Sequence, residues 1–404
     1  MNYKNLLPLS ILLFLLTISL PSFARNSLLD ESNNASIQSD SLSQRQVQNL
    51  FAFAKVYGYV KYFYPLNKKE RINWSLVASQ GVQKVIDAKS DDELRNDLMS
   101  VFRPVAPLLV IQHEAGNGVA AENDRPSIKS ASTESSTHYY YNLHQGLGQD
   151  KEDLPLLTRK ISGTLYKSMV VGVDEKDYQD LVTKGTILPV DSTYSARLSE
   201  SLTCSFPIVV TEAAFKSNDA YRLYNRKYKL DTGLHEDRIA TMVIFWNVFQ
   251  HFYPYLEQTE DWNNVFFRTM SQLTPSISES DFFRIANTFK ASLKDGHASL
   301  SYVNRTGIYK PFAAPAIQTA WVENKLVLSK VNISGPDIKQ GDIIEKINSK
   351  DVDTLVLQLK EEVSIANKNN GYLVAGEKIL SWKSSKENLL QVELTDSTGK
   401  QRVV

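Results

Sequence analysis

The sequence has little of several things that would classify a protein at once. It contains a single cysteine, Cys204, in 404 residues, so an internal disulfide scaffold is excluded. Its net charge is zero, with 45 basic and 45 acidic residues, so we expect no nucleic-acid partner. The hydrophobic fraction of 42% is too high for a wholly disordered chain. A length of 404 residues therefore favours two or three folded domains.

Long hydrophobic runs are also scarce, and the only one lies at the N-terminus. It covers residues 6–20, follows Lys4 and precedes the small-x-small pattern of Ser22-Phe23-Ala24, as in a secretory signal peptide. The run is shorter than the ~20 apolar residues that span a bilayer comfortably. We expect a signal peptide over residues 1–24 and an exported protein, periplasmic or extracellular, without stable membrane insertion after cleavage. An uncleaved anchor is the alternative.

Motifs of the common metal and cofactor sites are missing. The six histidines include no pair spaced for zinc with an intervening glutamate, and no acidic loop is patterned for calcium. Neither a P-loop nor a Gly-x-Ser-x-Gly nucleophile elbow is present. We therefore expect no metal and no cofactor, with a catalytic zinc held by histidines scattered along the sequence as the alternative. Cys204 lies in an alternating, strand-like segment, which favours a buried thiol over a nucleophile.

A duplicated segment organises much of the chain. Phe63-Tyr64-Pro65 recurs 189 residues later as Phe252-Tyr253-Pro254, and Trp74 recurs 188 residues later as Trp262. The serine and acidic residues that begin at Ser90 recur from Ser278, at the same spacing of 188. Apolar residues at helical spacing precede both prolines, and each serine with an acid three positions later is a helix-start signal. We predict two helical units, residues 46–112 and 233–310, with their aromatic residues packed in helix faces rather than forming a sugar-binding platform.

The remaining segments differ in composition from the two copies. Residues 25–45 are polar and rich in serine, which predicts a disordered leader. Residues 113–150 are mostly without apolar periodicity, which predicts a flexible loop. Residues 151–232 contain alternating stretches, which predict a small β domain.

The C-terminal segment, residues 311–404, has a distinct order of elements. A strand at 326–331 is followed by Gly341-Asp342-Ile343-Ile344, a helix over about 352–366, and closing strands at 391–394 and 402–404. This order predicts a small half-open β-barrel that accepts an extended peptide by strand addition. The fold class is therefore expected to be α+β and multidomain, with duplicated helical units, a small β domain and a C-terminal barrel.

Asp295-Gly296-His297 is the trio with the most chemical character. It follows an apolar helix directly, and its glycine suits a helix C-terminus that needs a positive φ. A catalytic Asp–His pair is the other interpretation. Adjacent residues rarely orient each other as a general base and its partner do, and no nucleophile is evident. The residues alone favour a structural turn and leave the catalytic pair open.

Three motifs in this order resemble the C-terminal processing, or tail-specific, serine peptidases. Gly341-Asp342-Ile343-Ile344, with Ile347-Asn348, resembles the core of a bacterial PDZ domain. Asp295-Gly296-His297 resembles the Asp-Gly-His-Thr signature of the family, with Ala298 in place of threonine, and residues 246–255 resemble its lead-in helix. The resemblance covers about residues 235–404. It implies an exported serine endopeptidase whose PDZ-like domain engages a polypeptide substrate or its C-terminal tail.

The resemblance also implies where the site residues lie. It implies peptide binding by the following residues: Pro315, Ala316, Ile317, Gln318, Gly341, Asp342, Ile343 and Ile344. It places Asp295, Gly296 and His297 near the cleft but gives none of them the role of nucleophile. The catalytic serine and lysine are expected beyond residue 404, and none is assigned within this chain. The alternative is a non-catalytic extracytoplasmic peptide-binding or adaptor protein that uses the same PDZ-like groove.

Overall fold

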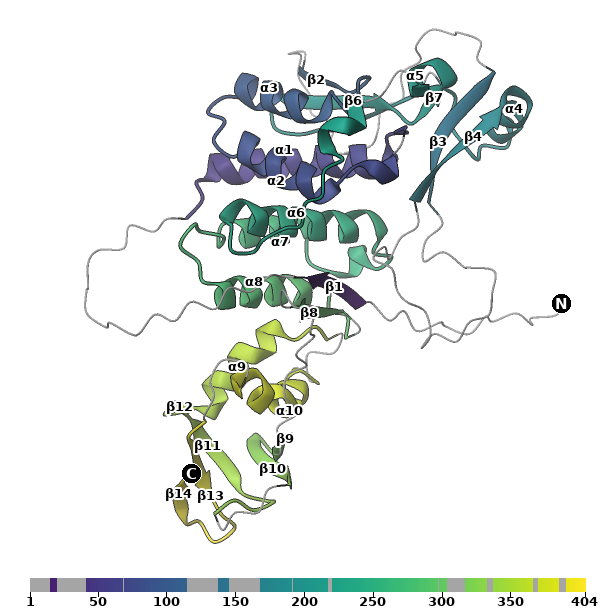
Figure 1. The fold of residues 1–404 in the computed structure, drawn as a ribbon. Coiled ribbons are helices and arrows are strands. Elements are labelled where there is room, and N and C mark those ends of the chain that lie inside the picture. The colour runs from purple at the N-terminus through teal and green to yellow at the C-terminus, as the bar shows by residue number, and fades with distance from the viewer. Residues whose placement is uncertain are drawn as a thin grey trace, which may run out of the picture. The chain divides into compact units, whose positions relative to one another are not determined.

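The computed structural model divides the chain into two compact units, which are described separately (Figure 1). The larger unit is Phe23–Glu279, and the smaller unit is Ser280–Val404 with Met1–Ser22. The structure describes residues 15–19, 41–67, 69–114, 137–144, 168–190, 192–216, 220–296, 298–303, 317–332, 337–365, 370–384 and 390–404. Most of the predicted leader, residues 25–45, and much of the predicted loop, residues 113–150, lie outside these ranges. Helices and strands together make an α+β protein.

The larger unit begins with three helices whose starts follow from local capping. Helix α1 (Gln44–Gly58) has Ser43 as its N-cap in a capping box with Gln46, and continues as a π-helical turn (Tyr59–Phe63) that ends before Pro65. Helix α2 (Trp74–Val85) is capped by the side chain of Asn73, and α3 (Asp91–Phe102) by that of Ser90.

The helices of the second copy begin and end at corresponding positions. Helix α6 (His235–Phe252) ends before Pro254, α7 (Trp262–Met270) starts at the second tryptophan, and α8 (Glu279–Ala291) starts directly after Ser278. The two copies also share an equivalent hydrogen bond between their first and second helices. The Tyr57 hydroxyl donates to the carbonyl oxygen of Trp74 at 3.2 Å, and the Trp246 indole donates to that of Trp262 at 3.1 Å. The aromatic side chains of Tyr57 and Trp246 are buried, as packed helix faces require.

Two three-stranded antiparallel sheets complete the larger unit. The first has the order β2-β6-β5 and the second β4-β3-β7, so both combine strands from before and after residue 151, where the small β domain was predicted to begin. Cys204 lies in β6 and is 2% exposed, and burial raises its pKa to about 12, which confirms a buried thiol. The strands are β2 (Val110–His113), β3 (His138–His144), β4 (Ser168–Asp174), β5 (Thr193–Arg197), β6 (Leu202–Pro207) and β7 (Val209–Thr211). Short helices are η2 (Lys69–Arg71), α4 (Glu175–Thr183), α5 (Glu212–Lys216), η3 (Ala220–Tyr224) and η4 (Leu256–Gln258).

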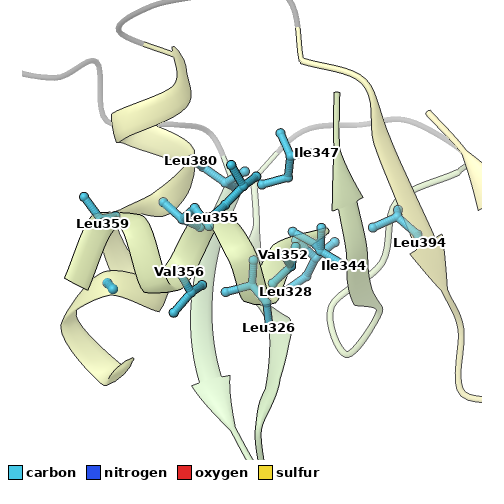
Figure 2. Packing of buried hydrophobic residues seen from close by; sticks show 12 residues of the cluster. Leu326, Leu328, Ile344, Ile347, Val352, Leu355, Val356, Leu359, Leu380 and Leu394 are labelled. Atoms are coloured by element: carbon cyan, nitrogen blue, oxygen red, sulfur yellow. The ribbon is translucent and has the colours of Figure 1, made fainter. Parts of the chain in front are cut away.

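The smaller unit is built on a six-stranded antiparallel sheet with the order β14-β13-β11-β10-β9, in which β12 also pairs with β11. Its strands are β9 (Ile317–Val322), β10 (Lys325–Val331), β11 (Ile343–Ile347), β12 (Lys350–Asp351), β13 (Val392–Thr395) and β14 (Gln401–Val403). Helices α9 (Val352–Glu362) and α10 (Asn370–Ser384) supply apolar side chains to a core that includes Leu326, Leu328 and Ile344 of the sheet (Figure 2). A second, two-stranded parallel sheet pairs β1 (Leu15–Ser19) with β8 (Ser299–Val303).

The described strands of the smaller unit form an open sheet that does not close into a barrel, within a fold of mixed helices and sheets as expected. The sheet is open because its two end strands, β14 and β9, do not pair with each other in the described ranges. Within the described ranges, the helices lack the combination of length and hydropathy needed to cross a bilayer.

Candidate functional site

Strand β9 is one end of the open sheet, and its backbone orientation follows from its neighbour β10. The backbone of Leu328 in β10 bonds towards β11, because its N–H donates to Asp342 O and its carbonyl accepts from Gly341 N. Thr319 is the cross-strand neighbour of Leu328, and the two therefore form a non-hydrogen-bonded pair. The N–H and C=O of Thr319 consequently point away from the sheet. Of the predicted peptide-binding residues, Ile317 and Gln318 belong to this strand, whereas Pro315 and Ala316 lie outside the described residues.

Helix α10 packs tightly on the face of the same strand. The Thr319 hydroxyl donates to the carbonyl of Gly376 at 2.6 Å. A Cβ atom at position 376 would lie 2.8 Å from the Cβ and 3.1 Å from the backbone N of Trp321, so only glycine fits there without movement. The helix therefore packs against the face of β9 and also against its outward backbone at Trp321, and Thr319 is only 3% exposed.

An aromatic stack lies beside this edge. The rings of Trp321 in β9 and Tyr372 in α10 are stacked with centroids 5.8 Å apart. The ammonium group of Lys360 in α9 lies 4.0 Å from the centroid of the Tyr372 ring, a cation–π distance. The stack gives β9 an apolar surface with a positive charge at one side.

The Gly-Asp-Ile-Ile motif has a different position, in the centre of the sheet. Strand β11 pairs with β10 on one side and β13 on the other, and it is separated from β9 by β10. Gly341 has a φ of 94°, and Ile344 is in the core at 2% exposure. Asp342 is buried, accepts from Lys339 N at 2.7 Å and forms an ion pair with Arg402. Strand addition at β9 therefore does not bring a peptide to Gly341, Asp342, Ile343 or Ile344, whose contacts are those of a structural turn and core.

The Asp-Gly turn follows α8 and is fixed by the segment after α9. The N–H of Asp295 donates to the Ser364 hydroxyl oxygen at 3.0 Å, and that hydroxyl donates to Lys290 O at 3.4 Å. Lys294, just before the turn, has a φ of 54°. Burial, with a further effect from Lys378, lowers the pKa of Lys290 to about 8. Gly296 completes the described part of the trio, and His297 lies outside the described residues.

The sequence reasoning missed the residues that shape the edge strand. Thr319, Trp321, Tyr372 and Gly376 were not singled out, and no second helix was predicted after α9. One signal was available, since Tyr372, Ala375, Ile379 and Leu380 follow helical spacing over residues 370–384. In the described part of the chain, no group of three or more His, Cys, Asp or Glu side chains is placed to hold a metal ion.

Comparisons with known proteins add little to this geometry. No family model matches the chain. No curated protein matches its sequence. Among solved structures, the chain is similar to that of mature CPAF, with a TM-score of 0.30 and 11% sequence identity over 42% of this chain. The match spans 34% of the CPAF chain, about a third of its length, and similarity at this level carries no argument about function.

Proposed function

We propose that the smaller unit binds an extended polypeptide segment, which adds to β9 as a further strand. The observation that carries this proposal is the position of β9 at the end of an open sheet, with the backbone N–H and C=O of Thr319 directed away from β10. Thr319 is 3% exposed beside α10, so the added strand would have to displace this helix from the edge. Such an edge is a template for main-chain hydrogen bonds with another strand. The Trp321–Tyr372 stack beside it offers an apolar surface to alternate side chains of the bound segment.

The finer proposal is that this binding serves a tail-specific type of serine peptidase. Its support is the order of the Asp-Gly-His and Gly-Asp-Ile-Ile motifs, together with the Ser364 hydroxyl that fixes the Asp295 turn next to the peptide-binding module. The hydrolysis itself would use a serine activated by a lysine, as the resemblance implies. A non-catalytic binding protein would use the same edge strand, so peptide binding is the activity to test first.

The test compares two substitutions at one position. Thr319→Pro removes the outward N–H and the hydroxyl, whereas Thr319→Val removes the hydroxyl but keeps the N–H. We expect Thr319→Pro to weaken binding of a fluorescein-labelled unstructured peptide by at least about tenfold in an anisotropy titration, since its main-chain bond is lost. Thr319→Val is expected to bind within about threefold of the wild type.

The matched control is Val403→Pro in β14, at the other end of the sheet. Val404 N and O both bond to Val392, so the N–H of Val403 points outward like that of Thr319. This variant should bind the peptide as the wild type does. Equal binding by wild type and Thr319→Pro would reject strand addition at β9. Peptide binding without cleavage by the longest native form of the protein would favour the adaptor over the peptidase.

We also propose that the protein is exported, on the basis of its N-terminal sequence pattern. N-terminal sequencing of the protein from its source cell should then begin at Arg25, and the mature protein would lack β1 and its pairing with β8. A chain that still begins with Met1 would contradict cleavage and favour the uncleaved anchor.

A further inference from the structure

Helix α10 lies against the part of β9 with which an added strand would pair. The backbone N–H and C=O of Thr319 are directed away from β10, yet this residue is only 3% exposed. The bond that joins it to the helix comes from its hydroxyl, which donates to Gly376 O at 2.6 Å. Because water and a partner strand would reach the N–H and C=O from the same side, the helix covers groups that strand addition needs.

Gly376 sets how closely the helix and the strand approach each other. A Cβ atom at this position would lie 2.8 Å from Trp321 Cβ and 3.1 Å from Trp321 N, so the backbone of α10 lies directly on that of β9. Glycine is among the least favourable residues in a helix interior, and a close backbone approach is a typical reason for its presence there. The glycine therefore favours the arrangement in which the edge is closed.

The helix has a second attachment, which does not involve β9. Ala375, Ile379 and Leu380 of α10 belong to the buried core of the smaller unit, as do Leu355 and Leu359 of α9 (Figure 2). The two helices also pack on each other. Packed helices can slide past each other by small amounts without unfolding. A shift of α10 along α9 would therefore uncover β9 and still leave the helix attached to the core.

We propose that α10 is an autoinhibitory helix of the peptide site, which opens when α10 shifts away from β9 as an intact helix. This inference rests on the proposed function, because it concerns how the same strand becomes accessible. The measured association constant of a peptide is then that of the open form multiplied by the fraction of molecules that are open. The contact between Thr319 and Gly376 lowers the affinity because it reduces this fraction.

Gly376→Ala is expected to increase the affinity for peptide. The three nearest neighbours of the added methyl group would be atoms of Trp321, so the substitution destabilises the closed arrangement through overpacking. We expect the full chain with this substitution to bind a fluorescein-labelled unstructured peptide at least about fivefold more tightly than the wild type in an anisotropy titration. Alanine favours a helix, so α10 should remain helical by circular dichroism.

Gly371→Ala is the matched control, because it makes the same substitution near the start of the same helix. A Cβ atom there would lie 3.0 Å from Ile365 Cδ1 and 3.0 Å from Lys360 Cγ, which are side-chain atoms outside β9. This variant should bind the peptide within about threefold of the wild type.

A disulfide across the contact tests the movement itself. Trp321→Cys and Gly376→Cys are combined in one chain, where Cβ atoms at the two positions would be 2.8 Å apart. This separation is shorter than the ~3.8 Å of an ordinary disulfide, so the bond needs a small adjustment. Cys204 is 2% exposed and does not compete for the bond. The form oxidised with glutathione disulfide should bind at least about tenfold more weakly than the same protein reduced with dithiothreitol.

The outcomes separate the autoinhibition from the proposed function. Tighter binding by Gly376→Ala, with weaker binding by the oxidised double variant, supports the autoinhibitory helix. Equal or weaker binding by a helical Gly376→Ala, or equal binding by the oxidised and reduced double variant, overturns the autoinhibition and leaves peptide binding at β9 in place. Absence of binding by the wild type and by every variant rejects the proposed function, and the autoinhibition with it.

Discussion

Replacing Gly58 by alanine is expected to destabilise the larger unit by about 3 kcal/mol, at the upper end of the usual cost of overpacking. Gly58 ends α1 where it meets α6. A Cβ atom there would lie 1.9 Å from Asn247 Oδ1 and 2.5 Å from His251 Nε2. Asn247 cannot move aside cheaply, because it is fully buried and its Nδ2 donates to Ala54 O at 2.9 Å and Val243 O at 3.0 Å.

Gly58 and Asn247 are also related to each other by the sequence duplication. Asn247 stands 189 residues after Gly58, which is the spacing of the two Phe-Tyr-Pro motifs. Corresponding positions of the two copies therefore face each other, and one of them must be small because the other is large. The free energy of unfolding is measured by urea denaturation of the wild type, Gly58→Ala, Asn247→Ala and the double variant.

The double variant is the control. Removing the Asn247 amide creates room for the new methyl group, so the double variant should lose at least about 1 kcal/mol less than the sum of the two single losses. If the free energy of unfolding of Gly58→Ala instead lies within about 0.5 kcal/mol of the wild-type value, the close approach of α1 and α6 is incorrect.

Replacing Arg402 by methionine is expected to destabilise the smaller unit by about 3 kcal/mol. The guanidinium group of Arg402 pairs with the Asp342 carboxylate, whose side chain is 4% exposed, and its Nε donates to Asp337 O at 2.6 Å. Methionine keeps much of the volume but leaves a buried carboxylate with one backbone donor, Lys339 N. Removing one partner of a buried pair costs far more than the net value of the pair itself.

Lys346→Met is the matched control in the same sheet. Lys346 in β11 pairs with Glu393 in β13 at 3.2 Å, but both side chains are well exposed, at 40% and 37%. The Lys346→Met substitution should lower the free energy of unfolding by less than about 1 kcal/mol, because solvent screens the ion pair. Both variants are measured by urea denaturation followed by circular dichroism. If Arg402→Met and Lys346→Met both lowered the free energy of unfolding by the same small amount, Asp342 would not be buried against Arg402. A direct role of the Gly-Asp-Ile-Ile motif in peptide binding would then have to be tested.

Much of the helical architecture could be predicted from local sequence. Ser90 and Ser278 mark the starts of α3 and α8, and prolines 65 and 254 mark the ends of the first helix in each copy. These signals act within one or two helical turns, so they do not depend on how the rest of the chain folds. The alternation around Cys204 likewise predicted a strand with a buried thiol.

The pairing of strands was much harder to predict. The sequence analysis predicted strands from local alternation and did not predict which distant strands pair with one another. In the structure β2 pairs with β6, and β3 pairs with both β4 and β7, across long intervening segments. Register between distant strands depends on the packing of their faces, which no short window of sequence contains.

Ile317 and Gln318 were expected to bind peptide and lie in β9, which the sequence analysis did not predict as a strand. Thr319 and Gly376 were missed because their contact joins residues 57 apart in sequence. Asp342 was expected at the peptide, which remains a prediction, and its ion pair with Arg402 joins residues 60 apart in sequence that no local pattern links. The peptide-binding interpretation of the edge remains a prediction, as do the roles of Asp295 and Gly296.

The contact between Thr319 and Gly376 has a consequence for hydrogen exchange. Because the strand and the helix are joined by this buried bond and by close backbone packing, β9 and α10 should open as a single cooperative unit. Their amides would then share one opening free energy, even though one element is an edge strand and the other a helix. A partner strand that adds to β9 would then slow deuterium uptake along the whole of α10, beyond its contact with Tyr372 at the start of that helix.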